Sequence, residues 1–178
     1  RNILISDALL TRLEDDEVEA VFAHELGHVR GRHFVLYLLF TLTVLTAMLL
    51  VEPWLGGPED GFWGYVARGA AALGIVWGVC FGYLSRKLER QADLLGAAQV
   101  GSTLRMQQAL ARISEASGQP GRLRTLTHGS IEERIRFLDE ASHDPGVQRR
   151  LNRQILGLTV AMAVGTGLGL ILLVLNGR

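Results

Sequence analysis

Residues 34–51 read FVLYLLFTLTVLTAMLLV, a run of 18 residues without one charged side chain. As an α-helix this run is about 27 Å long, which matches the hydrocarbon core of a bilayer. Two further apolar runs follow, at 62–84, where Arg68 is the one charge, and at 155–175, which has none. We therefore expect three transmembrane helices; helices buried in a protein core are the alternative.

The composition limits the classes of protein and site. The chain of 178 residues carries 18 basic and 18 acidic side chains, so its zero net charge offers no basic surface and predicts no nucleic-acid partner. Cys80, the one cysteine, cannot form an internal disulfide, and any metal must be held by histidines and carboxylates. Because the sequence starts at Arg1 without a leader, we expect an excerpt of a longer protein.

Basic side chains flank the apolar runs unevenly. The connector at 52–61, EPWLGGPEDG, has no basic residue, whereas eight basic residues lie beside the other ends of the runs. Because cytoplasmic loops are enriched in Lys and Arg, we expect 1–33 and 85–154 in the cytoplasm of a multi-pass protein. The eight are Arg30, Arg32, Arg86, Lys87, Arg90, Arg149, Arg150 and Arg153.

Residues 24–28, HELGH, match the pattern H-E-x-x-H inside a predicted helix. Histidines four residues apart lie on one helical face, so His24 and His28 can bind one tetrahedral zinc ion. Glu25 projects beside them and can accept a proton from a water whose pKa the metal lowers toward about 7. The alternative is a pair of histidines on a solvated helix face.

A hydrolytic zinc site needs a third protein ligand. The stretch 85–93, SRKLERQAD, places Glu89 and Asp93 on one helical face, where Glu89 can ligate and Asp93 can accept the second ring N–H of a histidine. Two acids on a helix more often form a solvated face. However, His28 lies six residues before the first apolar run and Glu89 five after the second, so both stand roughly 8 Å outside one membrane face. A transmembrane hairpin therefore favours Glu89 as the third ligand.

The oxyanion formed during peptide hydrolysis needs a donor, which contributes up to about 4 kcal/mol. His128 is the candidate, because it stands two residues before Ser130, the predicted cap of a helix that carries Arg134. An exposed loop histidine is the alternative. We interpret His33 as interfacial and His143 as a surface residue.

Shorter patterns predict the remaining elements. The run at 2–6, NILIS, is typical of a short strand, and the next helix is expected to begin with a capping pair of Asp16 and Glu19. An amphipathic helix is expected at 102–116. Small residues at four-residue spacing in the third apolar run could form a helix-packing face, with a chance run of glycines as the alternative. They are Ala161, Gly165 and Gly169.

Together these motifs resemble the HtpX-type integral-membrane zinc metalloproteases, in the gluzincin family that also includes the CAAX prenyl endopeptidases. Residues 5–33 look like the family's segment through H-E-x-x-H, and 85–93 match its S-R-x-x-E-x-x-A-D. The stretch 127–138, THGSIEERIRFL, is similar to its H-P-x-x-x-x-R block, with Gly129 in place of the proline. The resemblance covers most of the chain except the last apolar run.

The resemblance implies one zinc ion per chain, with catalysis by a general base that also acts as the acid. It implies a metal held by His24, His28 and Glu89, with Glu25 as that base. It further implies a supporting carboxylate beside the ligands and two basic groups flanking the substrate. These last three are Asp93, His128 and Arg134.

The expected fold is mainly α, a helix-dominated zincin-like α+β catalytic core in a polytopic membrane protein. Its expected parts are the motif-bearing half of the catalytic domain at 1–33, a transmembrane hairpin at 34–84, the second catalytic half at 85–154, and a C-terminal transmembrane helix at 155–175.

The expected function is zinc-dependent endopeptidase cleavage of membrane-associated or misfolded polypeptides, on the cytoplasmic face of a bacterial inner membrane. The alternatives left open are a CAAX prenyl-protein endopeptidase, a metalloprotease-like membrane sensor or transducer, and a structural membrane protein with a fortuitous motif. The lipid bilayer and a polypeptide substrate are the expected partners, and the pattern predicts no oligomeric state.

Overall fold

The structure, a computed structural model, describes residues 11, 13–56, 61–117 and 128–177. Within these ranges the chain is helical apart from turns and a single bridging residue at Gly129, and they contain no β-strand. The expectation of a helix-dominated protein is therefore confirmed. The strand predicted at 2–6 lies outside the described residues.

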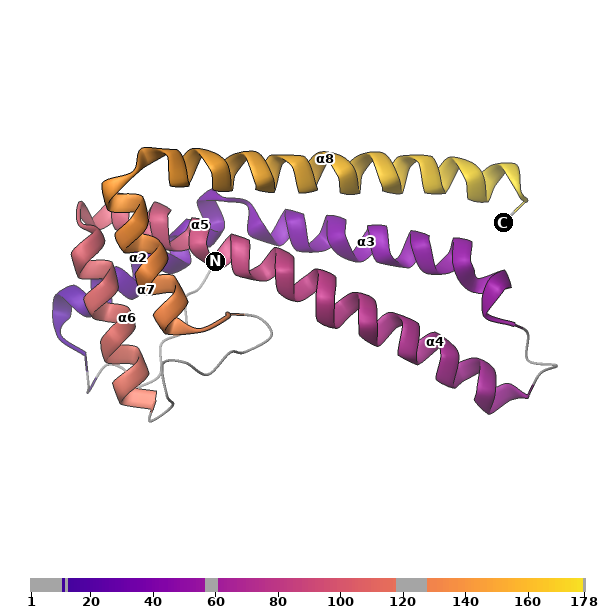
Figure 1. The fold of residues 1–178 in the computed structure, drawn as a ribbon, viewed down its shortest axis with the longest axis horizontal. Helices are drawn as coiled ribbons and strands as arrows, with labels where there is room; N and C mark the ends of the chain where they lie inside the picture. The colour runs from indigo at the N-terminus through magenta and orange to yellow at the C-terminus, as the bar shows by residue number, and fades with distance from the viewer. Residues whose placement is uncertain (1–10, 12, 57–60, 118–127, 178) are drawn as a thin grey trace. The chain divides into compact units, whose positions relative to one another are not determined.

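The chain divides into two compact units (Figure 1). The first comprises the described residues of 1–34 and 84–155, and the second those of 35–83 and 156–178. The first unit holds the candidate site. Its helices are α2 (Asp15–Arg30), α5 (Gly82–Val100, from residue 84 on), α6 (Thr103–Ser117), α7 (Ile131–His143) and the start of α8 (Pro145–Leu175).

Helix α2 begins with a different cap from the expected one. Glu14 is the N-cap, and the carboxylate of Glu17 accepts a hydrogen bond of 2.9 Å from the Glu14 backbone N–H. The predicted pair of Asp16 and Glu19 is therefore wrong by two residues. Because positions 14–17 are all acidic, the capping pattern can be placed at several starting residues equally well. At each of them an acidic side chain lies favourably near the positive end of the helix dipole.

Two glycines allow the helices of the first unit to approach closely. A Cβ on Gly27 of α2 would lie 2.5 Å from the backbone oxygen of Ala92 on α5. A Cβ on Gly96 of α5 would lie 2.6 Å from the terminal methyl carbon of Met106 on α6. Ala92 and Met106 are both buried. The face of α2 that carries His24 and His28 therefore packs directly against the middle of α5.

Side-chain caps begin α6 and α7. The Ser102 hydroxyl accepts a hydrogen bond of 3.2 Å from the backbone N–H of Arg105, and α6 starts at the next residue after Ser102. The Ser130 hydroxyl accepts one of 3.1 Å from the N–H of Glu133, so the predicted cap of α7 is confirmed. Helix α6 packs against both α2 and α7, and Leu138 of α7 is fully buried.

The second unit consists of long apolar helices (Figure 1). Within it α3 and α8 lie side by side, joined by a hydrogen bond of 2.8 Å between the hydroxyls of Thr43 and Thr166. A Cβ on Gly169 would lie 2.5 Å from Cγ2 of Thr46, whereas one on Gly165 would meet nothing within 4 Å. Of these two glycines, Gly169 therefore belongs to the predicted packing face and Gly165 does not. The elements are α3 (His33–Val51), η1 (Glu52–Leu55), α4 (Phe62–Val76), η3 (Trp77–Phe81) and the later part of α8.

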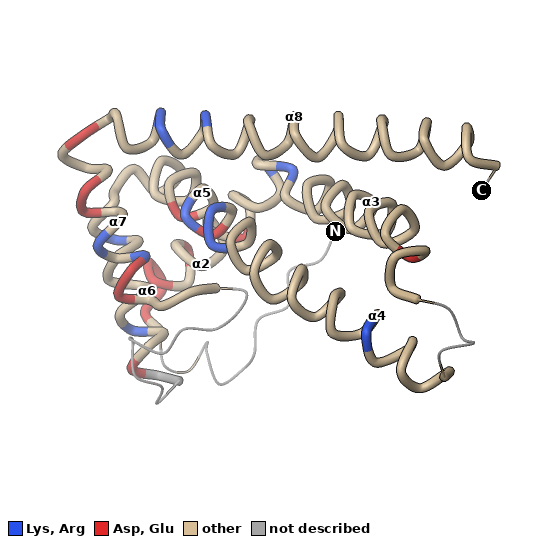
Figure 2. Tube along the Cα trace, turned by 45° about the vertical axis from the view of Figure 1, so that its right-hand side comes forward, with Lys and Arg blue, Asp and Glu red and all other residues tan. Residues whose placement is uncertain are grey.

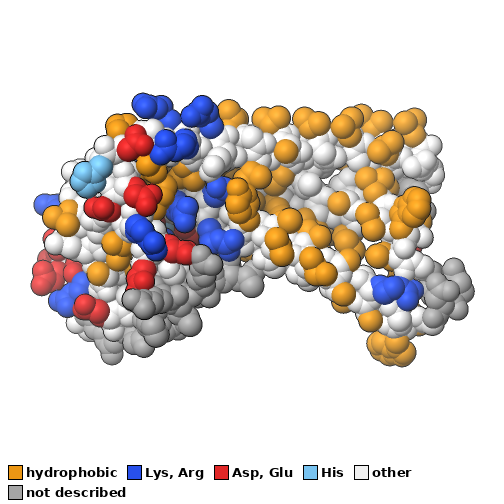
Figure 3. All heavy atoms as spheres, viewed as in Figure 1, with side chains coloured by type: hydrophobic (Ala, Val, Ile, Leu, Met, Phe, Trp, Pro, Cys, Tyr) orange, Lys and Arg blue, Asp and Glu red, His pale blue; other side chains and the backbone are white. Residues whose placement is uncertain are grey.

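Among the described residues, three helices are long and apolar enough to cross a membrane: His33–Leu55, Phe62–Val100 and Pro145–Leu175. Each contains one of the three predicted apolar runs and extends beyond it. Charged residues are sparse along the apolar stretches of these helices and numerous on α2, α6 and α7 (Figure 2). Large apolar side chains on α3, α4 and α8 are exposed (Figure 3). Such a surface is stable only in contact with lipid or another protein, which is consistent with a polytopic membrane protein.

Replacing Gly27 by alanine tests the contact between α2 and α5. The added methyl group overlaps the Ala92 backbone, so we expect G27A to lower the free energy of unfolding by about 1–3 kcal/mol. Gly157 of α8 is the matched control, because a Cβ there meets nothing within 4 Å. G157A should leave stability unchanged or raise it by about 0.5–1 kcal/mol. Thermal unfolding in detergent measures both; equal stability of the two variants would contradict the close approach.

Candidate functional site

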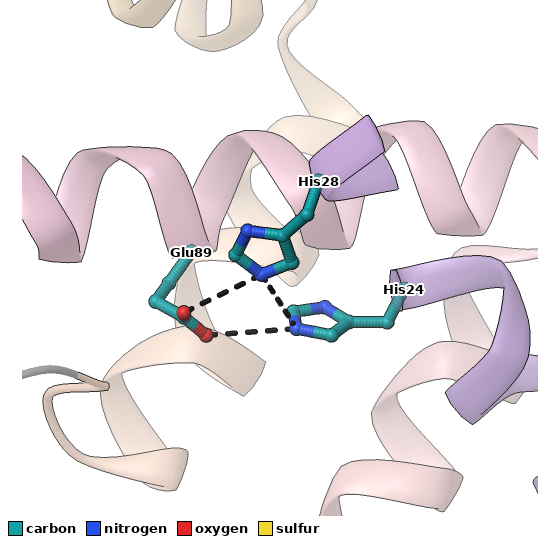
Figure 4. Close-up of side chains that lie close together, drawn as sticks. All are labelled: His24, His28 and Glu89. Carbon is teal, nitrogen blue, oxygen red and sulfur yellow. Dashed lines mark hydrogen bonds and ion pairs between the residues drawn. The ribbon is translucent and has the colours of Figure 1, made fainter. Parts of the chain in front are cut away.

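Three potential ligand atoms converge between α2 and α5 (Figure 4). The Nε2 atoms of His24 and His28 are 3.1 Å apart. The Glu89 oxygens lie 3.6 Å from the His24 Nε2 and 3.5 Å from the His28 Nε2. The two histidines are one turn apart on α2, and Glu89 reaches them from α5. The structure therefore brings together the three residues that the sequence singled out as metal ligands.

The spacing and the burial of these atoms fit a bound metal ion. A tetrahedral ion with ligands at about 2.0–2.1 Å separates its ligand atoms by about 3.3 Å, close to the spacing found here. Glu89 is 2% exposed, and its Oε2 has no hydrogen-bond partner among the described residues. A buried carboxylate oxygen without a hydrogen bond is costly, and the Arg134 Nη1, 3.4 Å away, does not form one with it, so this oxygen is available to ligate a metal ion. This group of two imidazoles and one carboxylate can hold a metal ion.

Asp93 and Arg134 orient His24. The Asp93 Oδ1 accepts a hydrogen bond of 2.9 Å from the His24 Nδ1, which leaves the lone pair of the ring on Nε2, facing the other ligand atoms. Asp93 is fully buried, and Arg134 of α7 donates to both of its oxygens at 2.6 and 2.8 Å. Nη1 of Arg134 also lies 3.4 Å from the Glu89 Oε2. Arg134 thus connects α7 to both acidic residues of α5.

His28 has an environment that favours its neutral form. Burial, together with the nearby His24, lowers the pKa of His28 to about 4, so its imidazole is uncharged at neutral pH. The uncharged ring is the form that binds metals. On its far side the His28 Nδ1 lies 2.8 Å from the Nδ1 of His33. His33 is 1% exposed, so it is buried within the unit, in a contact with His28 that its interpretation as an interfacial residue does not include.

His128 and Glu25 border the same group of ligands. The His128 Nδ1 lies 3.1 Å from the Glu89 Oε1, and the hydrogen bond to that carboxylate raises the pKa of His128. The His128 side chain is largely exposed, and Glu25 is exposed on the adjacent turn of α2. Both therefore face space that a substrate can enter.

A cavity of about 180 Å³ opens beside the ligands. It is smaller than the 300–1,000 Å³ typical of a site for a whole small molecule, so its size suits a single side chain. Its walls from α2, α6 and the start of α7 are mainly apolar. The lining residues are Val21, Met106, Ala109, Leu110, Ile113 and Ile131, with His24, Glu25, Glu89, His128 and Arg134 at its polar side.

Two residues beside the ligands, His33 and Gln91, are not predicted as site residues from the sequence. The interpretation of His33 as interfacial gives it no contact with the ligands, and Gln91, which bonds to it, carries no motif signal. The one available signal was a glycine followed by a third histidine shortly after the H-E-x-x-H pattern, at Gly31 and His33.

Comparison with known proteins identifies the family. Peptidase family M48 matches residues 1–142. The protease HtpX of Hahella chejuensis is 30% identical over 147 residues, which cover 75% of this chain and 50% of that protein. That of Stutzerimonas stutzeri is 32% identical over 167 residues, with 76% and 57% covered. An HtpX homologue of Aeropyrum pernix is 35% identical over 125 residues, with 64% and 39% covered. No solved structure matches the chain significantly.

The matched region includes every residue of the ligand group and its supports. The chain spans about half the length of these relatives. Within that span, the family match covers 142 of 178 residues and contains both the H-E-x-x-H helix and the helix that carries Glu89. The chain therefore belongs to peptidase family M48 and is an HtpX-type member of it.

Proposed function

We propose that this chain carries the catalytic site of a membrane-bound zinc endopeptidase. The observation that carries the proposal is the convergence, at 3.1–3.6 Å, of two imidazole nitrogens and a buried carboxylate, one oxygen of which accepts no hydrogen bond from the described residues, within a motif that supplies its own base. His24, His28 and Glu89 would hold one zinc ion and leave a fourth position open. Two imidazole nitrogens and one carboxylate oxygen are a ligand set found in catalytic zinc sites.

Glu25 is the residue proposed to move protons. A zinc ion, when bound, acts as a Lewis acid that makes water nucleophilic near neutral pH. Glu25 accepts the proton of the water whose oxygen attacks the peptide carbonyl carbon. It then donates that proton to the amine nitrogen as the C–N bond breaks, so the carboxylate is regenerated.

His128 is proposed as the donor to the oxyanion. It borders the cavity with Glu25 and holds a position beside Glu89, and its raised pKa increases the fraction that carries two N–H donors. Arg134 is buried against Asp93, so its proposed role is to hold the carboxylate that orients His24.

The substrate is proposed to be a polypeptide at the membrane surface, with an apolar side chain beside the cleaved bond. The apolar cavity next to the ligands supports the side-chain preference. The proximity of ligands and apolar runs along the chain supports the location, because His28 and Glu89 lie only six and five residues from them. The excess of Lys and Arg around those ends supports the cytoplasmic face.

Removing the proposed base and a proposed ligand should have separable effects. We expect E25Q to lower kcat by about 10²–10⁴-fold while one zinc per chain is retained. E89A should lose the zinc as well as the activity. Metal content by atomic emission and cleavage of a casein or membrane-protein substrate measure the two effects. E19Q, an exposed acid on the same helix, is the control; unchanged activity in E25Q would refute the mechanism.

A charge in the apolar cavity should alter substrate preference without removing the metal. We expect I113D to lower kcat/KM at least about tenfold for peptides with a large apolar residue beside the cleaved bond. L104D is the matched control, because Leu104 is exposed on the same helix and does not line the cavity. An equal effect of both variants across a peptide series would contradict the assignment of the cavity.

The proposed topology predicts which side of the membrane each connector faces. In a C80S background, W54C should react with an impermeant maleimide in intact cells, because Trp54 lies in the connector without basic residues. R149C should react only in inverted vesicles. The reverse pattern would place the candidate site on the other face.

A further inference from the structure

His33 is a buried histidine for which the proposed reaction has no step. It follows α2 directly after a two-residue turn, in which Arg32 adopts a positive φ of 53°. This turn folds the His33 ring back over the end of α2, where it packs edge to face on His28 with ring centroids 4.7 Å apart. A Cβ on Gly31 would lie 2.6 Å from Cδ2 of His33, so the ring occupies space that only glycine leaves free.

A chain of hydrogen bonds fixes the protonated nitrogen of each ring. Nε2 of Gln91 donates to Oδ1 of Asn152 at 2.9 Å, so the oxygen of the Gln91 amide is the atom that faces His33. That oxygen accepts only from a protonated Nε2 of His33, at 3.0 Å. Nδ1 of His33 is then an acceptor, and the Nδ1 of His28, 2.8 Å away, must be its donor.

The consequence reaches the proposed metal site. With its proton on Nδ1, the neutral His28 ring carries its lone pair on Nε2, which lies 3.1 Å from the His24 Nε2 and 3.5 Å from the Glu89 Oε1. His24 also carries its proton on Nδ1 and its lone pair on Nε2, because its Nδ1 donates to the Asp93 carboxylate. Both proposed ligands thus present lone pairs to one point, a repulsive arrangement unless a cation lies between them.

We propose that His33 is a positioning residue for His28, and that Gln91 and Asn152 hold His33 in the orientation that makes it an acceptor. The inference rests on the proposed zinc site. Outer partners of this kind set the tautomer and direction of a ligand and typically alter metal affinity 10–100-fold. Because Asn152 belongs to α8 and Gln91 to α5, the relay ties the ligand on α2 to two further helices of the same unit.

The test is the zinc dissociation constant of the full chain, measured by competition with a chelator. H33L keeps the bulk but removes the acceptor, and we expect zinc to bind about 10–100-fold more weakly. H33N places an amide oxygen near the position of Nδ1 and should recover most of this loss. H143L is the matched control, because His143 is exposed at the end of α7 and should not alter zinc affinity.

Two further variants keep the test decisive if H33L fails to fold. Q91M removes the acceptor for His33 and should weaken zinc binding in the same direction, and G31A should do so by displacing the ring. In the zinc-loaded wild type, ¹⁵N-edited NMR should show a slowly exchanging Nδ1 proton on His28 that is lost in H33L. Wild-type affinity in H33L and Q91M would overturn the relay while leaving the zinc site intact, whereas absence of zinc binding by the wild type would refute the proposed site itself.

Discussion

The close approach of α2 to α5 at Gly27 is the contact on which the candidate site depends. Because the Gly27 position has no side chain, the backbone of α5 lies directly against the face of α2 that carries the two motif histidines. Glu89 stands almost one turn before Ala92 and therefore reaches both imidazoles at 3.5–3.6 Å. A methyl group at this point would separate the two halves of the ligand group, which come from segments 61 residues apart.

A layer of hydrogen bonds surrounds the three ligand atoms and accounts for much of the buried polarity of the unit. Asp93, which accepts hydrogen bonds from Nε and Nη2 of Arg134, orients one histidine, and the relay through His33 is proposed to orient the other. The two supports differ in charge: a carboxylate makes a ligand more basic than a neutral imidazole does. Because only His24 is supported by a carboxylate, the site buries one supporting negative charge instead of two. Each further buried charge would need an opposite charge beside it.

Much of this arrangement could be predicted from the sequence, and the reasons for the failures are physical. Helical spacing puts His24 and His28 on one face, and the length of the apolar runs predicts three long apolar helices, as found. The start of α2 was misplaced because four consecutive acids fit several capping registers. The contact of His33 with His28 is not predictable from the sequence, because it depends on a turn at Gly31 and Arg32 whose geometry no periodic pattern encodes.

The central claim is that His24, His28 and Glu89 hold one zinc ion, and X-ray absorption at the zinc edge of the purified chain tests it most directly. We expect four ligands at about 2.0–2.1 Å, two imidazole nitrogens and two oxygens, and no sulfur. H24A, like E89A, should lose the zinc and with it the imidazole scattering. A wild-type zinc spectrum without imidazole scattering, or a zinc spectrum that is unchanged in H24A, would contradict this ligand set.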